Sequence, residues 1–483
     1  MLAGIAAWTA WLFAIVRTHH HEFRTQKFDL GNITQAVWST AQGRPLEVTH
    51  ASGEQLSRLA GHVDPVLVLL APAWIVAPTP LTLAFVQIAA CALGAIPVYC
   101  LGVKHLGSRA LGLASGLVYL AYPWLAWVAL DVVHPVTLAI PLLLFAVWFL
   151  DEDRLVSFSI VAALASLCGE LVGVTVAALG IWYAVARRRA RAGLAIAAAG
   201  VGWTAFALYV IVPRYSGEES VFYGLYETVG GSPQGVLWTA LTDPATILEQ
   251  LASHRNLSYI LALSVPLAGL FLLAPALAAA AVPQLLANTL SDMPTTADAY
   301  WHYTSVVIPI LVAATVLGAA RLATRARLLA AGVLLGLCAG LSAILGPWPQ
   351  LWSTSRLVPH QAWYGGTPPA GHIDALRAAV ALIPPDAPVS STGKVGAHLS
   401  ARRYVYSVPV VRRAEWIVID ERDPAVAPGV GASATARVRR GVADPAIIER
   451  FLARIDASPG WKRVFSRSGV HVYRRTRVDV GQP

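Results

Sequence analysis

PLTLAFVQIAACALGAIPVYCLGV, residues 80–103, contains no charged side chain and is long enough to cross a bilayer as one helix. A helix of about 20 apolar residues spans the hydrocarbon core of a membrane. The composition agrees, because 56% of the residues are hydrophobic and only 13% are charged. The sequence therefore predicts an all-α bundle that crosses the membrane many times. Other runs with almost no charge are residues 1–16, 110–130, 134–150, 192–213, 257–290, 303–320 and 328–346.

Basic residues in the short connections between these runs predict the orientation of the chain. Such loops remain in the cytoplasm. We therefore expect a plasma-membrane protein with about 11 crossings, a cytoplasmic N-terminus and an extracytoplasmic C-terminal part. Residues 1–16 lack a basic n-region and a cleavage site, so they are expected to remain as the first helix. The basic groups are Lys104 with Arg109, Arg154, Arg187-Arg188-Arg189 with Arg191, and Arg321 with Arg325 and Arg327.

Counting the crossings assigns the shorter apolar segments. Only one crossing fits between an external loop at residues 18–61 and the cytoplasmic Lys104, so the short segment Pro65–Ala77 is expected to lie in the outer interface. Residues 155–186 must begin and end in the cytoplasm, which predicts a hairpin with Gly169-Glu170 at its outer tip. Residues 257–290 must begin and end outside, with a turn near Pro275.

The pattern changes after Trp352 and predicts a small α/β domain at residues 355–483, separate from a membrane domain at residues 1–354 that includes the external loop 18–79. Residues 355–483 hold 19 of the 36 Lys and Arg residues and 10 of the 27 Asp and Glu residues, and so account for the whole net charge of +9. This surface is expected to be solvated, or to meet anionic lipids or envelope polymers. The predicted helices are His372–Ile383 and Pro445–Ile455; the predicted strands are Val389–Thr392, Tyr404–Val408, Trp416–Asp420, Lys462–Phe465 and Val470–Arg474; Pro424–Ala436 is expected to be a flexible loop.

Acidic, imidazole and amide groups crowd the first external loop, where an oily scaffold does not need them. Asp29 follows the first helix and is a candidate general base toward a hydroxyl; alternatively it caps a helix at Asn32–Ala41. Asp64 precedes Pro65, a favourable first helical residue, and therefore has the same two interpretations.

Further candidates lie far away in the sequence but are predicted at the same membrane face. Glu170 is the acid of an otherwise uncharged segment, which marks either function or a structural ion pair. Asp131 and His134 can share a helix face, or cap the next helix. His302, between Trp301 and Tyr303, suits a sugar, or belongs to an interfacial aromatic belt.

Other sequence signals exclude some functions. His19-His20-His21 is a weak metal signal because adjacent side chains point in different directions, so no metal ligand is assigned. No cofactor is firmly indicated, and a divalent metal is left open. The four cysteines fit no zinc or redox spacing. No phosphate loop, dinucleotide motif or nucleic-acid-binding signal is present.

Several motifs resemble a bacterial and archaeal family of predicted membrane proteins of unknown function. They are Phe28-Asp29-Leu30-Gly31-x3-Gln35-x2-Trp38-x4-Gly43-Arg44-Pro45, His62-x2-Pro65, Asp131-x2-His134-Pro135, Glu170, His302-Tyr303, and Ala397-His398-Leu399-Ser400-x-Arg402. The family in turn resembles the GT-C superfamily of integral-membrane glycosyltransferases. That resemblance implies a GT-C-like bundle with interfacial helices in the first external loop and Asp29 as the catalytic acid. Many GT-C members carry paired acids there, whereas Leu30 follows Asp29.

The resemblance implies an inverting glycosyltransferase that moves a sugar from a polyprenyl-phosphate donor to a glycan, lipid or protein acceptor of the cell envelope. Arg24, Lys27, Arg44, Arg58 and His62 are the nearest cations for the leaving phosphate. The alternatives are a transporter or flippase of a lipid-linked precursor, or a non-catalytic envelope scaffold. The predicted substrate-binding residues are Gln35, Arg44, His62, Asp64, Asp131, His134, Glu170 and His302.

Overall fold

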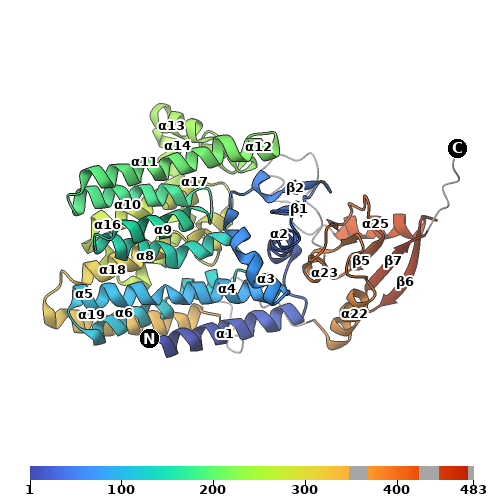
Figure 1. The fold of residues 1–483 in the computed structure, drawn as a ribbon, viewed down its shortest axis with the longest axis horizontal. Helices are drawn as coiled ribbons and strands as arrows, with labels where there is room; N and C mark the ends of the chain where they lie inside the picture. Colours follow the sequence, from blue (N-terminus) through green and yellow to red (C-terminus); the bar gives the residue numbers. More distant parts are fainter. Residues whose placement is uncertain (348–367, 424–444, 477–483) are drawn as a thin grey trace. The chain divides into compact units, whose positions relative to one another are not determined.

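The computed structural model describes residues 1–347, 368–423 and 445–476, and the chain forms two compact units (Figure 1). Within those ranges, unit 1 comprises residues 1–15, 59–66 and 84–347; unit 2 comprises residues 16–58, 67–83 and the residues from 368 onward. The predicted domain boundary at residues 354 and 355 and the predicted loop Pro424–Ala436 lie outside the described residues. Two helices, α1 (Leu2–His21) and α4 (Pro80–Leu93), contain residues of both units.

Several long helices of unit 1 run in one common direction (Figure 1), and the described elements of this unit after α4 are all helical. They are α5 (Ala95–Leu106), α6 (Arg109–Ala121), α7 (Pro123–Leu130), η4 (Pro135–Leu138), α8 (Ala139–Asp151), α9 (Leu155–Ser166), α10 (Val172–Ala186), α11 (Ala190–Phe206), η5 (Ala207–Ile211), α12 (Val212–Ser216), η6 (Val221–Val229), α13 (Pro233–Thr242), α14 (Pro244–Leu251), α15 (His254–Ser264), η7 (Val265–Leu267), η8 (Leu270–Leu273), α16 (Pro275–Ala278), η9 (Ala279–Ala281), α17 (Val282–Leu290), η10 (Pro294–Ala297), η11 (His302–Thr304), α18 (Val307–Ala319) and α19 (Thr324–Leu345).

Among the described residues, three helices are long and apolar enough to cross a membrane: Pro80–Leu106, Ala190–Ser216 and Thr324–Leu345. A fourth span results if α6 and α7, which meet at a bend of 50°, are counted together. The remaining apolar helices are shorter, so the number of about 11 crossings stays a prediction. The first two long helices contain the predicted runs 80–103 and 192–213, and the third contains 328–346 except its last residue.

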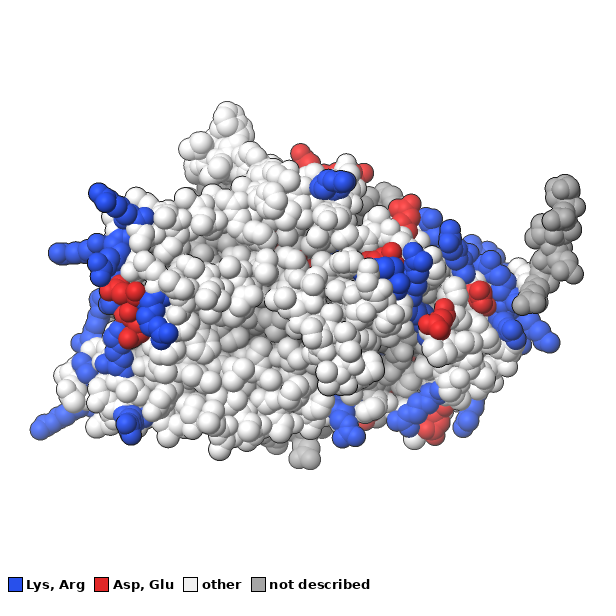
Figure 2. Space-filling view, in the orientation of Figure 1, with Lys and Arg blue, Asp and Glu red and all other residues white. Residues whose placement is uncertain are grey.

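The outer faces of these helices require an apolar solvent. Only 17% of the most apolar 18-residue stretch of Thr324–Leu345 is buried, although its mean hydropathy is 2.4. For Ala190–Ser216 the buried share is 22%. Figure 2 shows a broad face of unit 1 with almost no charged side chain, while Lys and Arg gather at the end where α5 and α6 meet. Water would not favour so much exposed apolar surface, whereas lipid does.

The basic clusters meet as the loop assignment requires. Lys104 Nζ lies 2.8 Å from Asp151 Oδ2, and an Arg187 nitrogen lies 3.5 Å from Asp151 Oδ1. Arg189 is paired with Asp153 at 3.0 Å. The connections α5–α6, α8–α9 and α10–α11 therefore lie at one end of unit 1. Three of the four predicted basic clusters therefore share a side.

Two predicted hairpins differ in how well they match the structure. Residues 155–186 form α9 and α10 around Gly169-Glu170, as expected. In residues 257–290 the backbone turns first at Ala268-Gly269, where both residues have positive φ angles of 49° and 65°. Pro275 instead begins α16. A proline favours a helix start, whereas the positive φ needs a residue such as Gly269.

Unit 2 contains a five-stranded sheet in the order β4-β3-β5-β7-β6. Strands β4, β3 and β5 are parallel, and β7 and β6 continue antiparallel. The elements predicted after residue 367 are present, with ends shifted by at most two residues, and within the described residues of that region the sequence missed the short helix α23. The elements are α22 (Ala370–Ala381), β3 (Val389–Ser391), α23 (Gly393–His398), β4 (Val405–Ser407), β5 (Trp416–Asp420), α25 (Pro445–Asp456), β6 (Trp461–Arg467) and β7 (Val470–Arg475).

The first loop belongs to unit 2 and shares a core with the sheet. Phe23 packs in one apolar cluster with Leu376, Val389 and Val472. Gln35 is 1% exposed and its amide donates to the carbonyls of Arg402 and Arg403. The loop contains η1 (Lys27–Gly31), α2 (Asn32–Ala41), β1 (Glu47–Thr49), β2 (Gln55–Ser57) and η2 (Arg58–Ala60), and is followed by η3 (Pro65–Leu70) and α3 (Ala71–Val76).

Candidate functional site

Asp131, His134 and His302 form one polar cluster in unit 1. Asp131 lies in the turn between α7 and η4 and is buried. His302 Nδ1 donates to Asp131 Oδ2 at 2.7 Å, and the His302 backbone N–H donates to the same oxygen at 3.0 Å. His134 Nδ1 lies 3.6 Å from Asp131 Oδ1 and donates to the Asp131 carbonyl at 2.9 Å. The imidazole rings of His134 and His302 are stacked, with centroids 3.5 Å apart.

A buried glutamine holds the turn that carries this cluster. Gln87 Nε2 donates to the carbonyls of Ala129 and Asp131, each at 3.1 Å. Its Oε1 accepts the backbone N–H of His134 at 2.7 Å. Gln87 is completely buried, so its amide satisfies backbone groups of this turn from inside the protein and fixes the turn's conformation. The sequence analysis missed Gln87, although an amide within the apolar run 80–103 was a signal for such a role.

The two histidines keep Asp131 ionised. Burial raises the pKa of the Asp131 carboxyl, but the nearby imidazoles and the His302 hydrogen bonds outweigh it and lower this pKa to about 2. Asp131, His134 and His302 thus lie in direct contact, which the sequence did not predict. His134 occupies the N-cap position of η4, as the capping alternative expected, but its side chain makes no capping hydrogen bond there.

Glu170 and His62 form a second polar pair in unit 1. Glu170 lies in the turn between α9 and α10, and its Oε2 accepts the Val63 backbone N–H at 3.1 Å. His62 Nδ1 lies 3.7 Å from Glu170 Oε1, and the His62 ring lies 4.6 Å from that of Phe222. Burial raises the pKa of Glu170, but the contact with His62 outweighs it, and the net shift is downward. The His62 side chain remains 46% exposed and is accessible to a ligand.

The turn that carries Asp131 and His134 lies next to the turn that carries Glu170. A Cβ placed on Gly169 would lie 4.0 Å from Val136 Cγ2, and these residues adjoin Glu170 and Pro135 respectively. Asp64, next to the His62 turn, is buried. Five of the predicted residues of unit 1, namely His62, Asp131, His134, Glu170 and His302, thus lie on adjoining turns that are far apart in sequence.

The other three predicted residues lie in unit 2. Asp29 is half-buried within η1, and Gly31, not Asp29, is the N-cap residue of α2. The helix-cap alternative for Asp29 was therefore wrong. Gln35 is tied to backbone carbonyls of the C-terminal sheet region, so its role is structural. Arg44 pairs with Glu47 at 3.1 Å and lies over the Trp38 ring.

Lys27 was a candidate phosphate ligand, but the structure assigns it elsewhere. It is buried, and its Nζ donates to Ser407 Oγ at 2.9 Å. Burial lowers the pKa of Lys27 to about 8. Its stem packs closely around Gly31 and Gly396, where a Cβ would clash with Lys27. Lys27 therefore anchors the first loop and does not present its charge to a ligand.

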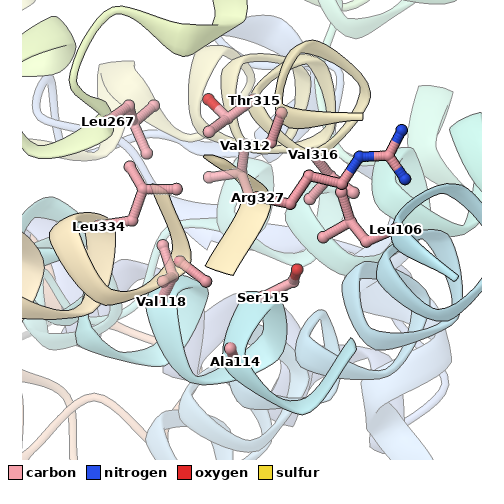
Figure 3. Close-up of a pocket in the computed structure, with 12 residues that line it drawn as sticks. Leu106, Ala114, Ser115, Val118, Leu267, Val312, Thr315, Val316, Arg327 and Leu334 are labelled. Carbon is pink, nitrogen blue, oxygen red and sulfur yellow. The ribbon is translucent and has the colours of Figure 1, made fainter. Parts of the chain in front are cut away.

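One small pocket of unit 1 is unrelated to these groups. It lies between α6, α18 and α19 and is lined mainly by apolar side chains such as Val118, Val312 and Leu334 (Figure 3). The guanidinium of Arg327, which also lines it, donates to the carbonyls of Ala320 and Leu322. Its volume of about 20 Å³ holds no more than a water, and none of the predicted site residues lines it.

Comparison with solved structures identifies the fold. The crystal structure of ArnT from Cupriavidus metallidurans bound to undecaprenyl phosphate matches with a TM-score of 0.52 at 13% sequence identity. The match covers 99% of this chain and 99% of ArnT. At this identity the likeness concerns the fold. No curated protein matched the sequence.

Comparison with protein families gives the relationship by sequence. The model described as "Predicted membrane protein (DUF2079)" matches residues 19–434, which is most of the chain. The matched range includes both polar groups of unit 1 and the Asp29 loop. The chain is therefore a member of the DUF2079 family of predicted membrane proteins.

Proposed function

We propose that this protein is an integral-membrane glycosyltransferase that transfers a sugar from a polyprenyl-phosphate donor to an acceptor of the cell envelope. One observation carries the proposal: the whole chain shares its fold with ArnT, whose crystal structure was bound to undecaprenyl phosphate. The motifs around Asp29, which resemble those of the GT-C superfamily, support the same function. The partners are a lipid-linked sugar, membrane lipid and a glycan, lipid or protein acceptor.

Asp29 is the proposed base. Its carboxylate takes the proton of the acceptor hydroxyl while the hydroxyl oxygen bonds to the anomeric carbon. The bond from that carbon to the phosphate oxygen breaks on the opposite face, and the phosphate leaves with the electron pair, so the configuration inverts. Asp29 caps no helix, and the neighbouring Phe28 is 70% exposed, which leaves this turn accessible.

The polar turns of unit 1 are the proposed sugar and phosphate contacts. Glu170 and Asp131 are held ionised by their histidine partners and can accept hydrogen bonds from sugar hydroxyls. Exposed His62 and half-buried Arg44 offer donors to the phosphate. Asp64 and Gln35 act by supporting the His62 turn and the Asp29 loop, respectively.

The proposed topology has about 11 crossings, with the basic loops and the N-terminus in the cytoplasm. The segment η3–α3 then lies in the outer interface, and the C-terminal domain is extracytoplasmic. The clustering of the basic connections at one end of unit 1 supports this arrangement.

The experiment is a donor-hydrolysis and transfer assay on the purified protein. Undecaprenyl-phosphate hexoses and pentoses are incubated with membrane extract as acceptor, and release of undecaprenyl phosphate is measured by mass spectrometry. Wild type is expected to release the lipid from at least one donor, and Asp29→Asn to lose this activity. Glu54→Gln, an exposed carboxylate change in the same loop, is the matched control.

Near-normal release by Asp29→Asn would disprove the assignment of the base. Movement of an intact lipid-linked sugar across proteoliposomes without release would instead favour the transporter alternative.

A further inference from the structure

We propose that Asp131, His134 and His302 bind one divalent transition-metal ion, with zinc as the best match. The three side chains offer one carboxylate oxygen and two imidazole nitrogens, and their ligand atoms all lie within 4.8 Å of one another. They come from two turns more than 160 residues apart, at Asp131 and His302, so only the fold assembles the group.

The separations are close to those of a metal centre. Bonds of about 2.1 Å in a tetrahedral site place neighbouring ligand atoms roughly 3.4 Å apart. In the structure His302 Nδ1 lies 2.7 Å from Asp131 Oδ2, and His134 Nδ1 lies 3.6 Å from Asp131 Oδ1. Bringing an Asp131 oxygen and either imidazole nitrogen to this spacing therefore requires shifts below about 1 Å, whereas the two imidazoles must also reorient relative to each other.

The imidazole stack must open for the ion to enter. The His134 and His302 rings are nearly parallel, with an interplanar angle of 10°. A metal lies in the plane of each imidazole that binds it, so one ion cannot lie in both planes of a parallel stack. Metal binding is therefore expected to rotate one ring and to replace protons that the cluster now holds.

The donor set and its surroundings favour zinc over magnesium or calcium. Two imidazoles and one carboxylate suit a borderline-soft ion, whereas magnesium and calcium prefer oxygen ligands. The buried Gln87 fixes both the Asp131 carbonyl and the His134 backbone, as supporting residues do in metal sites. The His134 and His302 side chains are 16% and 17% exposed, so an outer ligand can complete the coordination.

The role of the ion rests on the proposed function. Three protein ligands leave one position for the phosphate or a sugar hydroxyl of the lipid-linked donor. Its positive charge would stabilise the leaving phosphate, for which the first loop supplies fewer cations than the sequence indicated, because Lys27 is buried. Binding of the ion itself needs no substrate and can be measured alone.

The test uses the full-length protein in detergent, stripped with a chelator and titrated with Zn²⁺ or Co²⁺. We expect one Zn²⁺ per chain by elemental analysis, and a visible Co²⁺ spectrum of low-symmetry coordination. His302→Gln and Asp131→Asn should each weaken Zn²⁺ binding on the order of 100-fold, and Gln87→Leu by roughly 10-fold. His302→Cys should keep the ion and add a thiolate-to-Co²⁺ charge-transfer band, which detects ligation even if other variants fold poorly.

His105→Gln is the matched control. His105 also pairs with a buried aspartate, Asp151, at 2.8 Å, but Lys104 and Arg187 occupy the place of a second imidazole. Its Zn²⁺ affinity should equal that of wild type.

Absence of stoichiometric Zn²⁺ from wild type, or a folded His302→Cys protein without the charge-transfer band, would overturn the inference and leave a hydrogen-bonded proton network. Full sugar transfer by the metal-free protein would overturn the catalytic role of the ion but would leave the proposed glycosyltransferase activity intact. Zinc binding by a protein that transfers no sugar would overturn the proposed glycosyltransferase activity but not the zinc site.

Discussion

Lys27 Nζ donates a hydrogen bond to Ser407 Oγ at 2.9 Å, across 380 positions of the sequence. The bond joins the turn that carries Asp29 to strand β4 of the C-terminal sheet. A buried ammonium with a neutral partner is unfavourable, so this contact is retained for position more than for stability. The Asp29 loop and the C-terminal domain therefore act as one structural part.

The Lys27 contact predicts a pH-dependent stability. The folded-state pKa of Lys27 is lowered from 10.5 to about 8. Below pH 8 the folded state bears the full cost of the buried charge; between pH 8 and 10.5 the folded lysine loses its proton before the unfolded one does, so stability rises with pH. Lys27→Met should therefore gain stability relative to wild type at pH 7 and lose this advantage by pH 10, by on the order of 3 kcal/mol at most. Thermal unfolding in detergent at both pH values measures it.

The matched control for Lys27 is the exposed Lys462→Met, which should unfold like wild type at both pH values. A constant difference between Lys27→Met and wild type across this range would show that Lys27 is not buried as a cation.

The hydrogen bonds of Gln35 are expected to stabilise the first loop. Its Nε2 donates to Thr49 Oγ1 and to two backbone carbonyls, and its Oε1 accepts the Thr49 N–H at 2.9 Å. Gln35→Ala removes these buried hydrogen bonds, and although Thr49 Oγ1 still bonds to Gln55 and to the Arg403 carbonyl, the change should cost about 2–4 kcal/mol of unfolding free energy. Gln42→Ala, at the exposed end of the same helix, should cost little. Limited proteolysis of the first loop measures the difference, and equal cleavage of the two variants would contradict it.

Removing the charge of Glu170 is expected to weaken binding of the lipid-linked donor. Glu170→Gln keeps an acceptor for the Val63 N–H but removes the charge opposite His62, so the His62 turn loses its ionic contact. We expect a rise in KM for the lipid-linked donor of about 10-fold, with a smaller effect on kcat, because one charge-assisted contact is worth about 1.5–3 kcal/mol. Glu219→Gln, an exposed acid of the same unit, is the control. An unchanged KM would exclude Glu170 from substrate binding.

The close packing of α10 against α11 leads us to expect that a larger side chain is harmful at one glycine of α11 and tolerated at another. A Cβ on Gly200 would clash with the Gly173 carbonyl and with the backbone of Ala177, whereas a Cβ on Gly202, two residues later, meets no atom within 4 Å. Close helix contact in membranes depends on such small residues. Gly200→Val should lower the thermal midpoint strongly, or abolish folding, while Gly202→Val should remain close to wild type. Fluorescence-detected size-exclusion after a heating series distinguishes them.

The sequence alone predicted the local elements well. Apolar runs identified the long helices because burial in lipid needs a continuous apolar surface, which composition reports directly. Strand β5 and helix α2 have the predicted ends, since turn residues and alternation act within a few positions. The additional turn at Ala268-Gly269 was not predicted, because the positive φ at Ala268 depends on tertiary packing and is unusual for alanine.

Only the tertiary structure decided which polar groups meet. The sequence placed Asp131, His134, Glu170 and His302 at one membrane face, but it did not pair His302 with Asp131 or His62 with Glu170. It also did not show that Gln35 and Lys27 tie the first loop to the C-terminal sheet. Hydrophobicity is a property of each segment and can be read along the chain. Hydrogen bonds and ion pairs depend on distances of a few ångströms between distant residues, and these exist only after the helices have packed.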